Sequence, residues 1–321
     1  MTDARKTGRQ IVTVTLNAAI DKTYFVPALT PGKANRVARM IAQPGGKGIN
    51  VARVAHLLGE DVTATGIVGG SAGDFIEKEL TKQGIRHSFV RAEGESRVCL
   101  NVVTDAGESL ELLEPGLATE PAHYDRLASM LERLAETSSV IVLSGSLPAG
   151  APADAYRDLI ARLKPSGVPV LLDTSGPALA RGVFASPFMI KPNEEELAQL
   201  TGLFAAADPK SDLAGAVAAL LGQGVRCVAV SLGERGALVG TADGLYRVEA
   251  VPVQAVNPVG CGDAFLAGAA VGLHRGLPTL ELLRLAAACG ASNALQPSAG
   301  TVDPAQVRAF AESARVYRIT G

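Results

Sequence analysis

Tryptophan is absent from this 321-residue chain, and only 4 cysteines and 4% aromatic residues are present. Long hydrophobic runs are missing too. The longest, such as VIVL at 140–143, have the length of a strand and not of a membrane span. The cysteines are widely spaced without a CxxC pair, so we expect reduced thiols and neither a zinc site nor a disulfide framework. The first residues, MTDARKTGRQ, have no apolar stretch typical of a signal peptide. We therefore expect a cytoplasmic protein without a membrane partner.

An excess of charge of one sign is also missing. The 30 Lys and Arg residues nearly balance the 32 Asp and Glu residues, which leaves a formal net charge of −2. This balance gives no support to a nucleic-acid partner, although a local basic pocket for a small anion stays possible.

Several common enzyme motifs do not occur. The Walker A pattern GxxxxGK[ST] is absent, and the 4 histidines show no metal-ligand spacing. The SGS string at 144–146 lacks the GxSxG context of a hydrolase. Residues 66–73 are rich in glycine but miss the GxGxxG spacing of a dinucleotide site. A nicotinamide-dependent dehydrogenase is therefore disfavoured.

Short β-branched runs alternate with longer stretches rich in Ala and Leu along most of the chain. This alternation predicts one α/β domain over residues 1–321, with a mostly parallel sheet covered by helices on both faces. Segments 23–42 and 86–114 break it with short strand patterns, at 24–26, 36–39, 98–103 and 109–113. We interpret these two segments as a small antiparallel sheet that closes over an active site as a lid. A plain extension of the main sheet is the alternative.

The strongest chemical signal is NPVGCGD at 257–263, a glycine-rich turn followed directly by a helical pattern. Free amides at a helix N-terminus attract anions, and glycines let the backbone approach them closely. We expect the amides of Gly260, Cys261 and Gly262 to hold charge on a transferring phosphoryl group, and Asp263 to accept the proton of the attacking hydroxyl. Taken alone, the string also fits an ordinary helix start with an N-terminal aspartate.

Three further motifs allow two interpretations each. GGKGIN at 45–50 fits a cradle for a phosphorylated substrate, or a plain turn with a solvated lysine. KPNEEEL at 191–197 places Asn193 and Glu196 where they could organise Mg²⁺, or form a capping box. SLGERG at 231–236 follows a buried strand, where α/β sheets bind ligands, or forms a hairpin turn.

Six strings occur in one order: TLNAAID (15–21), PGGKGINVAR (44–53), SGSLPAG (144–150), KPNEEEL (191–197), SLGERGAL (231–238) and NPVGCGDAFLAG (257–268). Together they resemble the PfkB (ribokinase-like) sugar kinase family over nearly the whole chain. Within this family the chain is most similar to the branch of 1-phosphofructokinases and tagatose-6-phosphate kinases. The resemblance implies a ribokinase-like fold with a β-lid and an ATP-dependent sugar-phosphate kinase that uses Mg²⁺.

The resemblance also implies residue roles by position. Asp263 matches the catalytic base, and Gly260, Cys261 and Gly262 match the anion hole. The implied ATP-binding positions are Ser231, Leu232, Gly233, Glu234, Arg235, Gly236, Gly262, Asp263, Lys191 and Asn193. The implied sugar-binding positions are Asp21, Gly45, Gly46, Lys47, Asn50 and Arg97, of which Arg97 meets the phosphate already on the sugar. Asn193, Glu196 and Asp173 are the positions implied near Mg²⁺.

Two departures from the family pattern and the choice of sugar need comment. Cys261 stands where the family usually has alanine, and Ala18 where it often has proline; neither change affects a backbone amide of the anion hole. The strings at 96–101, 111–114 and 257–264 are similar to those of tagatose-6-phosphate kinases, whereas 1-phosphofructokinase is the commoner activity of the branch. We expect conversion of fructose 1-phosphate to fructose 1,6-bisphosphate, with conversion of tagatose 6-phosphate to tagatose 1,6-bisphosphate as the alternative.

Other activities and the assembly state stay open in the sequence. A 6-phosphofructokinase is a less favoured alternative, because those relatives tend to have glycine where this chain has Lys47. A catalytically silent sugar-phosphate-binding regulator is disfavoured by the intact Asp263 and by the intact pair Asn193 and Glu196. The exposed edges of the lid strands would be covered in a homodimer.

Overall fold

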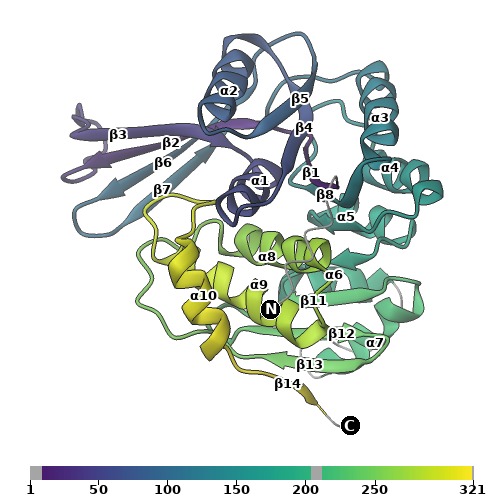
Figure 1. Ribbon diagram of the computed structural model, residues 1–321. Helices are drawn as coiled ribbons and strands as arrows, with labels where there is room; N and C mark the ends of the chain where they lie inside the picture. The colour runs from purple at the N-terminus through teal and green to yellow at the C-terminus, as the bar shows by residue number, and fades with distance from the viewer. Residues whose placement is uncertain (1–8, 204–211, 320–321) are drawn as a thin grey trace.

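The alternating segments of the sequence form two sheets in the computed structural model, which describes residues 9–203 and 212–319. The lid strands stand off from the main body, whose helices lie on the two faces of the larger sheet (Figure 1). No helix of the described residues is both long and apolar enough to cross a membrane. Residues 1–8, 204–211 and 320–321 of the expected single domain lie outside the described residues, and the extent of that domain stays a prediction.

The main sheet has ten strands in the order β14-β13-β12-β11-β10-β9-β8-β1-β4-β5. Its strands from β11 to β5 pair in parallel, and β12, β13 and β14 add an antiparallel edge. The strand bounds are β1 Gln10–Thr15, β4 Val62–Val68, β5 Arg86–Arg91, β8 Ser138–Ser144, β9 Val170–Asp173, β10 Met189–Ile190, β11 Cys227–Ser231, β12 Ala237–Thr241, β13 Gly244–Val248 and β14 Val316–Ile319. The predicted mostly parallel sheet is confirmed.

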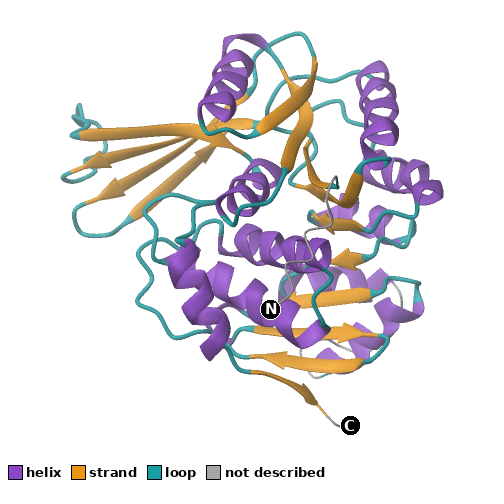
Figure 2. Cartoon of the chain, in the orientation of Figure 1, coloured by secondary structure: helices purple, strands orange, loops and turns teal. Residues whose placement is uncertain are grey.

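Helices cover both faces of this sheet, as predicted (Figure 2). One face packs against α1 Lys47–Leu57, α2 Gly70–Lys82, α8 Cys261–Arg275, α9 Thr279–Ala294 and α10 Pro304–Ser313. The other packs against α3 Pro121–Ala135, α4 Ala155–Leu163, α5 Gly176–Val183, α6 Glu194–Leu203 and α7 Leu213–Gly222. Two short 3₁₀ helices are η1 Lys164–Ser166 and η2 Gly233–Arg235.

The central strands are mostly apolar because each of their faces is buried under a layer of helices. In β1, Ile11 packs into the core beside α1 and α8, whereas Val12 and Val14 pack into the core beside α3. All three side chains are fully buried. This strand lies inside the sheet, between β8 and β4. Its carboxyl end leads directly into β2 of the lid and thereby positions the lid.

The lid is a four-stranded sheet in the order β3-β2-β6-β7. Its strands are β2 Ala19–Val26, β3 Arg39–Gly45, β6 Arg97–Thr104 and β7 Ser109–Leu113. The expectation of a purely antiparallel lid was wrong in one pairing, because β2 and β6 run parallel. The chain enters β2 from β1 and enters β6 from β5, and both β1 and β5 belong to the main sheet. Strands β2 and β6 therefore both run away from the main sheet.

The predicted lid segments also differ from the structure at their ends. Residues 86–91 form β5, which pairs in parallel with β4 in the main sheet and does not belong to the lid. The strand expected at 36–39 begins only at Arg39, and the lid strands extend beyond the predicted 23–42 segment to Ala19 and Gly45. These extensions bring the lid down to the glycine turn where α1 begins.

Candidate active site

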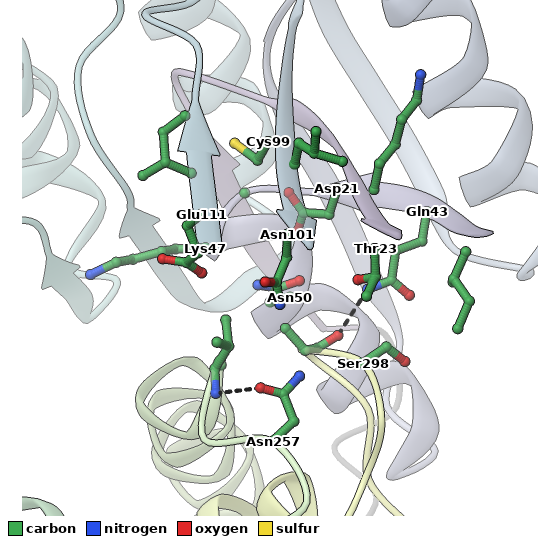
Figure 3. A pocket seen from close by; sticks show the side chains of 18 of the residues that line it. Asp21, Thr23, Gln43, Lys47, Asn50, Cys99, Asn101, Glu111, Asn257 and Ser298 are labelled. Atoms are coloured by element: carbon green, nitrogen blue, oxygen red, sulfur yellow. Dashed lines mark hydrogen bonds between the residues drawn. The ribbon is translucent and has the colours of Figure 1, made fainter. Parts of the chain in front are cut away.

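A cavity of about 280 Å³ lies between the lid and the turn that begins α8 (Figure 3). Its wall on the lid side comes from all four lid strands. The remaining wall comes from α1, from the glycine turn at 257–263 and from the loop at Ser298 and Ala299. Of the predicted residues, Asp21, Gly46, Lys47, Asn50, Arg97, Gly260 and Asp263 line it. The structure thus gathers the predicted base and five of the six predicted sugar-binding positions around one space, and Gly45 is the exception.

Asp263 lies in the first turn of α8 and is 7% exposed. Its Oδ2 accepts a hydrogen bond of 2.8 Å from Nδ2 of Asn50 on α1. Burial raises the pKa of Asp263 to about 6, against the opposing effects of the Lys47 ammonium and the Asn50 hydrogen bond. A carboxyl with such a pKa is largely ionised at neutral pH and still accepts a proton readily, which suits a general base.

The turn before Asp263 places backbone amides at the start of α8. Gly260 is the N-cap of α8 in the left-handed conformation, with φ 83°, and no side chain caps this end. A Cβ on Gly260 would lie 2.8 Å from the Cβ of Ala299, so glycine is needed for space as well as for conformation. The unpaired amides at the start of a helix attract an anion. The arrangement fits the predicted anion hole.

Cys261, the departure from the family pattern, is half-buried and faces α9. Its Sγ accepts a hydrogen bond of 3.5 Å from Nδ2 of Asn293, and burial raises the pKa of its thiol. The thiol is free, as are those of Cys99, Cys227 and Cys289. The side chain at 261 contacts α9 through Asn293, and its backbone amide donates to the carbonyl oxygen of Pro258 at 3.3 Å.

The buried Asp173 lies between Lys47, which follows the glycine turn at 45–46, and Lys191, which lies beside the turn at 260–262. Lys47 is the first residue of α1, directly after Gly46, whose φ of 101° requires glycine. The Nζ atoms of Lys47 and Lys191 lie 3.5 and 3.4 Å from the two carboxylate oxygens of the buried Asp173. A Cβ on Gly262 would lie 3.1 Å from Nζ of Lys191. Positive charge therefore gathers beside the turn that begins α8, where a phosphoryl group would sit.

Asp21 points back into the pocket from β2, over the glycine turn. Its carboxylate lies where a Cβ on Gly45 would be, so any larger residue at 45 would displace it. Burial raises the pKa of Asp21, although Arg53 and Arg97 attract its charge and the Gly46 amide donates to it. A carboxylate held this way is a strong acceptor for a sugar hydroxyl.

Arg97 begins β6 at the root of the lid and is half-buried in the pocket wall. It donates from Nε to the carbonyl oxygen of Asn17 at 3.2 Å and from Nη1 to that of Glu114 at 3.4 Å. These two carbonyls fix the guanidinium at the pocket, where it could bind a phosphate. The geometry agrees with the position predicted for it.

Asn193 and Glu196 form a capping box at the start of α6. The amide nitrogen of Glu196 donates to Oδ1 of Asn193 at 2.8 Å, and that of Asn193 donates to Oε2 of Glu196 at 3.0 Å. The capping box that the sequence allowed at this motif is therefore confirmed. The half-buried Glu196 carboxylate keeps free lone pairs and fits Mg²⁺, which takes few protein ligands and completes its shell with water and phosphates. In the described residues, no group of three His, Cys, Asp or Glu side chains could hold a metal by itself.

The predicted nucleotide loop 231–236 lies outside the sugar pocket but next to the capping box. Ser231 forms a bridge with Asn193, and the exposed Arg235 pairs with Glu194 at 2.5 Å. The loop connects β11 to β12 as a hairpin, so the structural interpretation of this motif also holds. The side chain of Leu232 is buried in the core, which leaves only its backbone for an ATP contact.

Several residues of the pocket wall were missed in the sequence. They are Thr23, Gln43, Asn101, Glu111, Asn257 and Ser298, all labelled in Figure 3. The lid strands bring Thr23 to the same face as Asp21, and Asn101 to the same face as Cys99 and Arg97. The period of two along each lid strand was the available signal.

Comparison with known proteins decides the family. The model of the pfkB family carbohydrate kinases matches residues 12–306. The chain belongs to the pfkB family. It is therefore a carbohydrate kinase, and the enzymes of this family transfer a phosphoryl group from ATP to a sugar.

Individual PfkB proteins resemble this one along nearly their whole length. Tagatose-6-phosphate kinase of Staphylococcus epidermidis is 36% identical over 295 residues, which cover 91% of this chain and 94% of that one. The crystal structure of phosphofructokinase-2 from Escherichia coli has a TM-score of 0.88 at 26% identity, with 96% of this chain and 99% of that chain covered. A possible 1-phosphofructokinase from Thermotoga maritima has a TM-score of 0.85 at 23% identity, with 97% and 100% covered, and shows the shared fold. The PfkB kinase described here thus has the ribokinase-like fold that its sequence implied.

Proposed function

We propose that this PfkB kinase transfers the γ-phosphoryl group of ATP to the free primary hydroxyl of tagatose 6-phosphate, which yields tagatose 1,6-bisphosphate and ADP. The observation that supports this choice is the 36% identity to a tagatose-6-phosphate kinase across 91% of the chain. The sequence analysis favoured fructose 1-phosphate and kept this sugar as its alternative. The similarity supports the alternative better than the first choice.

In the proposed reaction, Asp263 removes the proton from the attacking hydroxyl. Its Oδ2 is fixed by Asn50 at 2.8 Å, while Oδ1 stays free for the hydroxyl. The oxygen of the hydroxyl attacks the γ-phosphorus, and the bond from that phosphorus to the β–γ bridging oxygen breaks. The amides of Gly260, Cys261 and Gly262 stabilise the charge on the transferring group. Asp263 holds the proton until product release.

The same proposal assigns the two ends of the sugar to different cations. Arg97, held by carbonyl oxygens at the root of the lid, binds the phosphate that the sugar already carries. Lys47 faces Asp173 and Asp263 and neutralises charge near the transferring group. Asp21 and Asn50 bind sugar hydroxyls, and Gly45 and Gly46 let the sugar approach the backbone.

We also propose that ATP lies along the loop 231–236 and the start of α6, with its γ-phosphate toward Gly262 and Lys191. Mg²⁺ bound to the phosphates would lie near Glu196 and Asn193 and would neutralise charge on the phosphate oxygens. Asp173 is given no direct contact with the metal, because each of its carboxylate oxygens already faces a lysine ammonium.

The lid has an exposed apolar edge that a second copy of the chain would cover. All five residues of β7 are exposed, and Leu110, Leu112 and Leu113 are 47%, 54% and 63% exposed. The strand has a neighbour on one side only, in β6. We therefore propose a homodimer through the lid. Light scattering should give twice the chain mass for the wild type, and the Leu112→Glu variant should weigh one chain mass; a monomeric wild type would overturn the proposal.

A substrate panel tests the proposed activity. ADP release with Mg-ATP is measured in parallel with tagatose 6-phosphate, fructose 1-phosphate, fructose 6-phosphate and unphosphorylated tagatose. We expect the highest kcat/KM for tagatose 6-phosphate, and a value for tagatose at least about 100-fold lower because the phosphate contact is missing. A higher kcat/KM for fructose 1-phosphate would replace the proposed sugar by the alternative.

A further inference from the structure

Arg53 is a buried arginine on α1 for which neither the motif nor the proposed mechanism gives a task. Its side chain is 6% exposed. Its Nε donates to Oε1 of Gln83 at 3.2 Å, and Nη1 donates to Oδ1 of Asn50 at 3.2 Å and to the carbonyl oxygen of Ala299 at 3.1 Å. Nη2 donates to the carbonyl oxygen of Pro44. All four acceptors are uncharged oxygen atoms.

A buried cation with only neutral acceptors is unusual for packing alone. Removing a charge from water is costly, and an apolar side chain of similar size would fill this space without that cost. Burial lowers the pKa of Arg53 to about 10, while the charge of Asp21 opposes the shift. The guanidinium is therefore still charged at neutral pH. Its hydrogen bonds, rather than its volume, are the feature that needs an explanation.

The contact with Asn50 decides which way the Asn50 amide faces. A guanidinium has donors and no acceptor, so the oxygen of the amide must face Arg53. The nitrogen of the same amide then faces Asp263, at 2.8 Å from its Oδ2. With the amide turned over, its nitrogen would meet the guanidinium and its oxygen would meet the carboxylate. Both contacts would then be repulsive.

We propose that Arg53 is a positioning residue for the kinase reaction: it holds the Asn50 amide so that a donor faces Asp263. The same guanidinium donates hydrogen bonds to the carbonyl oxygen of Ala299 and to that of Pro44, directly before the glycine turn at 45–46. The inference rests on the proposed function, because it deepens the role of Asp263 as the base. Arg53 itself lines none of the pocket and contacts no reacting atom.

The packing around Arg53 leaves little room for the guanidinium to move. A Cβ on Gly300 would lie 2.8 Å from Nη1 of Arg53 and 2.8 Å from Cα of Asn50. The amide nitrogen of Gly300 is held by Oδ1 of Asn293 on α9 at 2.9 Å. The loop therefore approaches Arg53 and Asn50 so closely that no side chain fits at position 300.

Other charged groups act on Asp263 from the elements packed around it. Lys47 on α1 and Lys191 before α6 stabilise its ionised form, and Asp173 at the end of β9 destabilises it. None of these three groups hydrogen-bonds Arg53. Loss of Arg53 should therefore act on Asp263 through Asn50. Without the oriented donor, the ionised carboxylate loses a hydrogen bond and its pKa rises.

The first test compares Arg53→Lys and Arg53→Met with the wild type and with Arg86→Met, a control at an exposed arginine outside the site. We expect kcat with tagatose 6-phosphate to fall about 10- to 100-fold in both Arg53 variants. The acid limb of the kcat profile should move up by about one pH unit, with an unchanged KM for ATP. Arg53→Lys keeps the buried charge, and hence the fold, but lacks the planar fork that reaches Asn50 and Ala299 together.

A purely structural role would give a different result. Both Arg53 variants would then melt at a lower temperature, and the acid limb of each folded variant would coincide with that of the wild type. That coincidence overturns the proposal. A double-mutant cycle with Asn50→Ala adds a second criterion, since Arg53→Lys should cost little further activity once Asn50 is gone. Additive effects would show that Arg53 does not act through Asn50.

A readout without turnover separates this inference from the proposed function. Carboxyl ¹³C NMR of the free protein follows the titration of Asp263, which is identified by its loss in Asp263→Asn. The Asp263 pKa should be higher in Arg53→Lys than in the wild type. If the wild type is inactive on every ketohexose phosphate but the Asp263 pKa rises in Arg53→Lys, the inference is supported and the proposed substrate is wrong. An active wild type with no shift in Arg53→Lys would overturn the inference alone.

Discussion

The side-chain Nδ2 of Asn50 lies 2.8 Å from Oδ2 of Asp263, across 213 positions of the chain. This hydrogen bond joins the start of α1, which follows the lid, to the start of α8, which follows the second glycine turn. The proposed sugar-binding turn and the proposed base are thus directly hydrogen-bonded. A sugar hydroxyl bound at Asn50 would lie next to the carboxylate that deprotonates it.

Replacement of Asp263 by asparagine tests the base most simply. A positioned general base contributes about 10²–10⁴ in rate, so kcat of Asp263→Asn should fall by that factor. The KM for ATP should change little, because the amide is isosteric and the helix amides remain. The matched control is Asp243→Asn, at an exposed aspartate in the turn between β12 and β13. Turnover of Asp263→Asn within threefold of the wild type would remove this residue from the chemistry.

The pH dependence of kcat follows from the same carboxyl. Burial raises the pKa of Asp263 to about 6, and only the ionised form accepts a proton. We therefore expect kcat to fall as the pH drops through about 6 and to level off above about 7. The substrate phosphates titrate in this range too, so the residual rate of Asp263→Asn serves as the control. That rate should stay flat; an equal fall in both proteins would assign the titration to the substrates.

Arg97 should govern affinity for the phosphorylated sugar. A lost charge-assisted hydrogen bond costs about 1.5–3 kcal/mol, so the KM of Arg97→Gln for tagatose 6-phosphate should rise roughly 10- to 150-fold. The change in kcat should be smaller, because Arg97 lies at the far end of the sugar in the proposed complex. Arg39→Gln is the control on the same sheet, since Arg39 lies over the Phe25 ring, outside the pocket wall. Equal KM values in both variants would place the sugar phosphate elsewhere.

Glu196 should set the dependence on Mg²⁺. The Glu196→Gln variant keeps an acceptor for the Asn193 amide, so the capping box and α6 are preserved. It removes the negative charge, and the Mg²⁺ concentration for half-maximal activity should rise about 10-fold or more. Glu195→Gln removes an exposed charge in the same turn and should leave that concentration unchanged. The proposal for Glu196 fails when the two variants behave alike.

The sequence predicted those parts of the site that depend on local chemistry. The turn at Gly260 and the capping box of Asn193 and Glu196 each belong to a motif of seven residues, and their geometry is as expected. The parallel sheet was also predicted, because strands buried on both faces have continuous apolar runs. Such features need no knowledge of distant neighbours.

Features that depend on distant partners were missed or misplaced. Residues 86–91 have the same short-strand pattern as the lid, and only their pairing with β4 assigns them to the main sheet. The parallel pairing of β2 with β6 likewise joins segments separated by α1 and α2. The acceptors of Arg53 include Ala299, 246 positions away, so no local pattern marks its task. Strands β13 and β14 were not predicted, because they have only five and four residues.

The central claim is that this pocket phosphorylates a ketohexose monophosphate. The most direct measurement is ³¹P NMR of the purified protein with Mg-ATP and tagatose 6-phosphate. We predict loss of the γ-phosphate signal of ATP together with a new phosphomonoester signal, coupled to the C1 protons of the sugar, in equal amounts. Unchanged sugar phosphate, with ATP either intact or hydrolysed to inorganic phosphate, would contradict the claim.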